Sequence, residues 1–183
     1  MVNWQVTRLS QPPAVAALTV ADLVCLGVER HEPRPDVRDE AQALALLLQA
    51  ERVLETRFGV VARPAEFRMA GDLDDEAATN RVDLPLAPVA ALTSASADGR
   101  DLPLRLVPGG MLASKGRLAV ELLAGWPAGR MPHLVQAAMC RMAAHWLRTP
   151  ADIQAGGFEP TRGTVEQYLA LFGPRCLASE EVG

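Results

Sequence analysis

The chain has 183 residues, of which 49% are hydrophobic and 22% are charged, a balance that supports a buried core and excludes a disordered chain. Aromatic residues make up only 4%, which argues against a single-stranded nucleic-acid platform, because such platforms stack bases on exposed rings. The net charge of −4 provides no general attraction to DNA or to anionic lipid.

The cysteines indicate a reducing compartment. Cys25, Cys140 and Cys176 are odd in number, far apart and without a CxxC pair, so a disulfide framework is not expected. The apolar run 14–18 is too short for a signal peptide, and no run approaches the roughly 20 residues that span a bilayer. We therefore expect a soluble protein that is made inside the cell and has no membrane partner.

The N-terminal region predicts one short helix. Residues 1–13 have no regular pattern and are expected to be irregular. Thr19 and Asp22 form a capping box, which predicts a helix over residues 20–26 that ends at Gly27. Residues 29–35 are charged and contain two prolines, as in an exposed loop.

A long helix is predicted over residues 36–58, capped by Asp36 or Asp39 and ended by Gly59. Its apolar residues cover more than half of the circumference, which is wider than a one-sided surface helix requires. Either the helix is buried between layers of its own domain, or one stripe meets a neighbouring subunit. The two stripes are Leu44, Leu47, Leu48, Leu54 and Phe58, and the adjoining Leu46, Ala50 and Val53.

Residues 60–124 have a β-type pattern. Pro64 makes the strand over 61–67 an edge strand or a bulge, and residues 71–80 form an acidic loop. Further strands are predicted over 82–86, 89–94, 102–107 and 116–123, with Asp98-Gly99 as a hairpin turn between 89–94 and 102–107.

A third helix is predicted over residues 132–148, opened by Pro132 and ended before Pro150. Val135, Met139, Met142 and Trp146 form its apolar face, and Arg141, His145 and Arg148 form a polar face.

After a linker over residues 151–163, a capping box at Thr164–Gln167 predicts a nine-residue helix. A helix of that length is unstable alone in water. Its apolar face therefore either folds back on the parent domain or docks on another protein, and we favour docking. That face consists of Val165, Tyr168, Leu169 and Phe172.

We find no pattern of a catalytic, cofactor or metal site. Residues 109–116 lack the spacing of a phosphate loop. The acidic residues 72–83 lack the glycine at the sixth position and the glutamate at the twelfth that a calcium loop needs. His133, Cys140 and His145 do not share one helix face, as metal ligands would. We expect a protein that is not an enzyme.

The order of segments resembles the head-to-tail connector (adaptor) proteins of tailed bacteriophages and gene transfer agents. The residues that carry this resemblance are LLLQAERVLETRFG at 46–59, VDLPLAPVAALTSASADG at 82–99, GWPAGRMPHLVQAAMCRMAAHWLR at 125–148 and TVEQYLALFGPR at 164–175. The chain departs from the family pattern in its acidic loop and at Phe172-Gly173, which replaces a Pro-Tyr-like pair.

The resemblance implies an α+β fold: a small helical bundle with an inserted antiparallel β region and a C-terminal helical tail. Residues 1–150 would form the connector domain, and residues 151–183 the linker and docking tail. The family forms a ring, commonly of twelve copies, beneath the capsid portal, with a stopper or tail terminator on the other side and DNA passing through its channel. Val165, Tyr168, Leu169 and Phe172 would dock on the portal, and Leu46, Ala50, Val53, Arg141 and His145 would close the ring.

Two other hypotheses remain open: a regulatory module whose tail helix inserts into a partner, and a small metal-dependent enzyme that uses His133 or His145 with the acidic loop. Under the adaptor hypothesis, Leu54→Asp is expected to unfold the domain, whereas Leu46→Asp should spare the fold and block ring closure.

Overall fold

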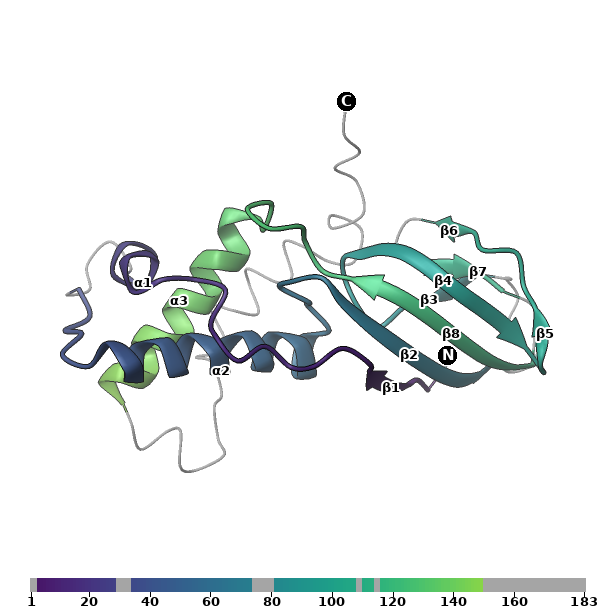
Figure 1. Cartoon of the computed structure of the whole chain (residues 1–183), viewed down its shortest axis with the longest axis horizontal. Helices are drawn as coiled ribbons and strands as arrows, with labels where there is room; N and C mark the ends of the chain where they lie inside the picture. Colours follow the sequence, from purple (N-terminus) through teal and green to yellow (C-terminus); the bar gives the residue numbers. More distant parts are fainter. Residues whose placement is uncertain (1–2, 29–33, 74–80, 108–109, 114–115, 150–183) are drawn as a thin grey trace. The chain divides into compact units, whose positions relative to one another are not determined.

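The computed structural model describes residues 3–28, 34–73, 81–107, 110–113 and 116–149 (Figure 1). Within the region expected to form the connector domain, the chain forms two compact units. The helical unit comprises the described parts of residues 12–58 and 128–149, and the β unit those of 3–11 and 59–127. The fold is α+β, as predicted. The predicted linker and tail over residues 151–183 lie outside the described residues.

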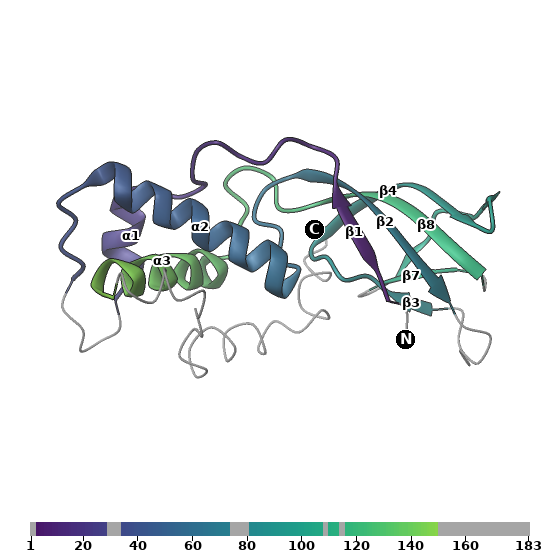
Figure 2. The same ribbon diagram turned by 90° about the horizontal axis from the view of Figure 1, so that it is seen from below.

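The helical unit contains the three predicted helices, which pack against one another (Figure 2). They are α1 (Val20–Leu26), α2 (Glu40–Phe58) and α3 (His133–Arg148). The predicted capping box of α1 is present: Thr19 Oγ1 accepts from the Asp22 N–H at 3.2 Å, and Asp22 Oδ2 accepts from the Thr19 N–H at 2.8 Å. The start and end of α1 are therefore set by local sequence signals.

Helix α2 begins at Glu40, which is later than the predicted start near residue 36 and agrees with the second of the two predicted capping residues. Asp39 is the capping residue, since its Oδ1 accepts from the N–H groups of Ala41 at 2.9 Å and Gln42 at 3.2 Å. Asp36 instead forms a 2.7 Å ion pair with Arg38. Gly59, with φ of +67°, follows the last helical residue as predicted.

The core of the helical unit is built mainly from α2 and α3. Alanines on both helices let their backbones approach closely, and the predicted apolar face of α3 is buried. The buried residues are Ala43, Leu46, Leu47, Ala50, Glu51 and Leu54 on α2, and Val135, Ala137, Ala138, Met139, Cys140, Met142, Ala143, Ala144 and Trp146 on α3. Each fully buried large side chain contributes about 2 kcal/mol of apolar burial.

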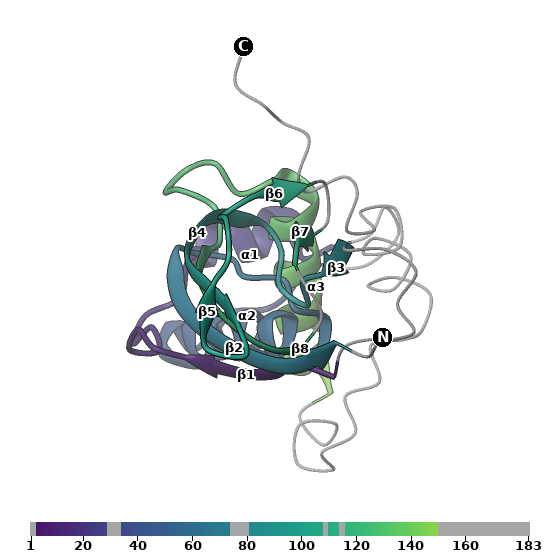
Figure 3. The ribbon, with the colours of Figure 1, turned by 90° about the vertical axis from the view of Figure 1, so that its right-hand side faces the viewer.

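The β unit consists of two antiparallel sheets around a common interior (Figure 3). The larger sheet has the order β1-β2-β8-β4-β5, and the smaller has the order β3-β7-β6. The strands are β1 (Gln5–Arg8), β2 (Ala65–Leu73), β3 (Arg81–Asp83), β4 (Val89–Ala97), β5 (Arg100–Asp101), β6 (Leu106–Val107), β7 (Gly110–Leu112) and β8 (Gly116–Ala124).

Along β2 and β8, side chains point alternately into the core and onto the outer face of the sheet. Phe67 and Met69 on β2 are buried with Val120 on β8, and Met69 lies opposite Val120 in the register. On the other face, Arg68 pairs with Glu121 at 2.7 Å. The period of two residues places apolar side chains inside and charged side chains outside.

Two expectations about the start of the larger sheet are wrong. Residues 5–8, expected to be irregular, form edge strand β1, which pairs with β2. Strand β2 begins after Pro64, includes Gly71–Leu73 of the expected acidic loop, and lies between β1 and β8 instead of at an edge. The four-residue strand β1 has no local signal of its own. The Trp4 indole N–H, which donates to the Asp83 carbonyl at 3.0 Å, helps hold this segment in the β unit.

The Asp98-Gly99 hairpin is confirmed, with positive φ at both residues. Its second strand is only β5, however, and β6 belongs to the smaller sheet. The pairing with β4 continues to the Leu102 N–H, which donates to the Ala95 carbonyl at 2.9 Å. Pro103 follows and has no N–H to donate, so the expected continuous strand over 102–107 is interrupted there.

Candidate functional site

The described residues contain no group of three or more histidine, cysteine or acidic side chains that could hold a metal ion. The three candidates on α3 do not converge: His133 is exposed, Cys140 is buried and His145 is half-buried. A metal-dependent enzyme built on these three side chains is therefore not supported.

Cys140 is chemically inert where it lies. It is fully buried against α1, where the Cβ of any residue replacing Gly27 would come within 3.0 Å of the Cys140 carbonyl oxygen. Burial, followed by the nearby Asp22 and Cys25, raises the pKa of the Cys140 thiol to about 12. Since the thiolate is the form that attacks substrates or binds metals, Cys140 supplies neither function near neutral pH.

This burial predicts a difference between two thiols of the helical unit. In a Cys176→Ser background, iodoacetamide at pH 8 should modify the exposed Cys25 readily, and Cys140 only when the unit opens. Mass spectrometry of peptides after timed alkylation measures both rates. Equal rates in the native protein would contradict the burial of Cys140, and equal rates in concentrated urea provide the control.

The structure describes only part of the two loop motifs considered from sequence. Gly110 lies in β7 and Gly116 opens β8, so the glycines lie in strands and not at the start of a helix, where a phosphate loop would place them. Asp72 lies in β2, paired with Arg117 of β8 in the register. Residues 74–80 lie outside the described part of the chain.

The predicted ring residues of α2 divide into two groups. Leu46 is 7% exposed and Ala50 is fully buried, so both belong to the core of their own helical unit. Val53 is half-buried. Helices α1 and α3 of the same chain pack against α2, and the burial of Leu46 and Ala50 argues against their forming a surface stripe.

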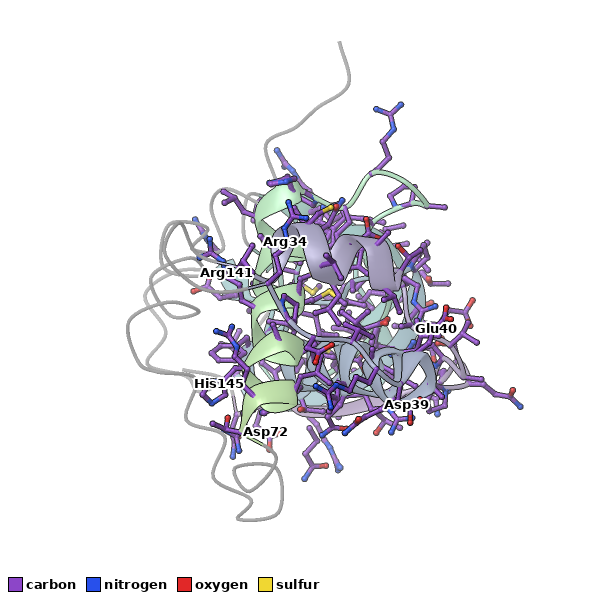
Figure 4. The ribbon with its side chains drawn as sticks, turned by 90° about the vertical axis from the view of Figure 1, so that its left-hand side faces the viewer. Arg34, Asp39, Glu40, Asp72, Arg141 and His145 are labelled. Atoms are coloured by element: carbon purple, nitrogen blue, oxygen red, sulfur yellow. The ribbon has the colours of Figure 1, made fainter. Side chains whose placement is uncertain are left out.

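The predicted ring residues of α3 lie at the surface of the helical unit. Arg141 and His145 are half-buried, and Arg148 is exposed with its Nε donating to the Ala144 carbonyl at 3.2 Å. Figure 4 shows Arg141 and His145 on one side of the unit, and Asp39 and Glu40 on the opposite side. The polar face predicted from the sequence is therefore present.

The sequence analysis did not mark one apolar surface, which lies in the β unit. Leu104 is 52% exposed and Leu106 is 41% exposed. Pro103 is the signal that could have revealed it, since it interrupts the strand that was expected over residues 102–107.

The predicted docking residues Val165, Tyr168, Leu169 and Phe172 lie outside the described residues, so their role stays a prediction.

Among the helices described, none combines the length and the apolar character needed to cross a membrane.

No protein-family model matches the chain, and no curated protein matches it. The chain does match solved structures. It is similar to a chain in the neck of an empty GTA particle computed with C6 symmetry, with 23% identity, 98% coverage of both chains and a TM-score of 0.57. The chain shares the fold of a gene transfer agent particle protein.

Two other solved structures contain a similar chain. One is the neck of a native GTA particle computed with C12 symmetry, with 22% identity, 98% coverage of both chains and a TM-score of 0.58. The other is the virion of a native gene transfer agent particle, with 22% identity, 97% coverage of both chains and a TM-score of 0.57. At these identities the likeness establishes a common fold over nearly the whole chain.

Proposed function

We propose that this chain is a structural adaptor in the neck of a gene transfer agent or phage-like particle. Copies form a ring beneath the capsid portal and join it to the tail or to a stopper protein. One observation carries the proposal: the fold of the chain matches that of a chain in a GTA neck over 98% of both. A match of that extent includes the helical unit and the β unit together, so it is more than a shared small motif.

The ring is proposed to contain twelve copies. Two of the similar structures are necks computed with C6 and C12 symmetry, and repeated copies of one chain close such a ring by head-to-tail contacts. Of the five residues expected to make these contacts, Val53, Arg141 and His145 reach the surface. Leu46 and Ala50 would act indirectly, by holding α2 in place.

The proposed partners are the portal on one side and a stopper or tail terminator on the other. Leu104 and Leu106 offer an apolar surface for the tail-side protein. DNA would pass through the channel without sequence-specific binding, because a chain of net charge −4 neutralises few phosphates. The chain would be made in the bacterial cytoplasm and would finish in the particle neck.

The tail supplies the first test. Deleting residues 164–183 should leave both described units folded and abolish binding to the portal, because the apolar residues from Val165 to Phe172 are removed. Co-sedimentation of the purified variant with its portal measures the binding, and circular dichroism measures the fold.

A shorter deletion of residues 177–183 is the control, since it keeps the proposed docking residues and should bind as the full chain does. Full portal binding by the longer deletion would refute the anchor role. Binding of the tail to some other protein, with none to the portal, would favour the regulatory module instead.

A further inference from the structure

The turn between β4 and β5 contains the only aspartate of the chain that is followed by a glycine, the pair Asp98-Gly99. Both residues are exposed and both have a positive φ, of +49° and +76°, which is the pattern of a two-residue type I′ turn. Asp98 is the one non-glycine residue with a positive φ among those that the structure describes. The proposed adaptor function assigns no role to this pair.

The backbone nitrogen of Gly99 is accessible. Its N–H donates no hydrogen bond within the described part of the chain, and none of the atoms described lies within 4 Å of a Cβ placed on Gly99. Glycine has no side chain of its own to hinder this nitrogen. The nitrogen and the Asp98 side-chain carbon Cγ are close in the covalent structure, so a bond between them closes a five-membered ring.

The carboxylate of Asp98 is held at the turn by β8. Its Oδ1 accepts from the Arg117 N–H at 2.9 Å, and the Asp98 N–H donates to the Arg117 carbonyl at 2.9 Å. These two hydrogen bonds keep the side chain against the hairpin instead of in solvent. When a nucleophile attacks Cγ, negative charge develops on the carboxyl oxygens, and a backbone N–H that already binds one of them stabilises that charge.

The hairpin has a second turn form that favours ring closure. Type I′ and type II′ turns both fit a two-residue hairpin, and rotation of the peptide between Asp98 and Gly99 converts one into the other. In the type II′ form, φ stays positive at Asp98 while its ψ becomes about −120°. The φ of Gly99 becomes negative, which glycine permits without strain. This ψ turns the Gly99 nitrogen toward the Asp98 side chain, as in a five-membered imide.

We propose that Asp98-Gly99 is a site of spontaneous isoaspartate formation in the folded protein. The Gly99 nitrogen bonds to the Asp98 Cγ, and the nitrogen's proton leaves with the hydroxyl of the carboxylic acid as water. Water then adds to the resulting cyclic imide. Breaking the ring bond from the nitrogen to Cγ restores aspartate, whereas breaking the bond to the backbone carbonyl carbon of Asp98 leaves an isoaspartyl link. Water is the only other reactant.

The isoaspartyl link changes the β4–β5 hairpin. It adds a methylene to the backbone of the turn, and it removes the side-chain carboxylate that accepts from the Arg117 N–H. The type and length of a turn set the register of the strands that it joins, so the pairing of Ala97 with Arg100 is altered. The modification therefore acts on this end of the β unit, and the helical unit keeps its structure.

Incubation of the full-length protein near neutral pH in water labelled with oxygen-18 tests the proposal. Peptide mapping with electron-transfer fragmentation locates isoaspartate, and one labelled oxygen marks each turnover of the imide. We expect at least about threefold faster formation at Asp98 in the folded chain than in the same chain unfolded in guanidinium chloride, because the turn holds the reacting groups together. Formation in the folded chain that is no faster than in the unfolded chain would overturn the proposal.

Two controls belong to the same hairpin. Asp101 is exposed like Asp98 but is followed by leucine, and it should form at least about tenfold less isoaspartate, since a side chain hinders the attacking nitrogen. Gly99→Ala should lower the rate at Asp98 by a similar factor. If circular dichroism shows that this variant does not fold, the comparison of Asp98 with Asp101 in the wild type still decides. Equal amounts at the two aspartates would refute the site.

Discussion

Leu54→Asp is expected to unfold the helical unit. Leu54 is fully buried on α2, so the substitution leaves an unpaired carboxylate in an apolar interior and removes the packing of a leucine. Together these effects cost about 4 kcal/mol or more, a large part of the stability of a small domain. Urea unfolding followed by circular dichroism measures the loss.

Leu46→Asp is now expected to destabilise the same unit, because Leu46 is only 7% exposed. The burial of Leu46 inside its own unit argues against the sequence-based expectation that this substitution would spare the fold. Ala45→Asp is the control: it introduces the same charge on α2 at an exposed position. It should change the free energy of unfolding by only about 0.5 kcal/mol. Equal urea midpoints for Leu54→Asp and Ala45→Asp would disprove the assigned core.

Gly59→Ala is expected to have the second largest effect, about 3 kcal/mol, from a left-handed backbone and a steric overlap combined. Gly59 has φ of +67°, and a Cβ there would overlap the carbonyl oxygen of Pro85. Because that oxygen belongs to the backbone, relief requires the chain to move. The difference in urea midpoint between variant and wild type measures the effect.

Gly99→Ala separates the effect of the left-handed backbone from the effect of the steric overlap. Gly99 also has a positive φ, of +76°, but none of the atoms described lies within 4 Å of a Cβ placed there. Its substitution should cost about 1 kcal/mol, which is the conformational part alone. If Gly59→Ala and Gly99→Ala lower the free energy of unfolding equally, the close approach of Pro85 to Gly59 does not contribute to the loss of stability.

Local signals predicted the helices well. The capping box at Thr19 fixes α1, and the apolar spacing from Val135 to Trp146 fixes the buried side of α3. The β region was harder, because strand pairing depends on distant residues. Strand β1 exists through its pairing with β2, and residues 5–8 alone give no indication of that partner.

Helix α2 shows why the proposed assembly surface was only partly predictable. Hydrophobic spacing tells which side of a helix is buried, but not whether the covering residues come from the same chain. Leu46 and Ala50 are covered within their own unit, whereas Arg141 and His145 lie at the surface as the polar pattern indicated.

Electron microscopy of the purified chain mixed with its portal tests the adaptor account most directly. We predict a closed ring of twelve copies seated on one face of the portal, with an open channel along its axis. A chain that leaves the portal bare at high concentration, or binds it as scattered single copies without closing a ring, would contradict the account.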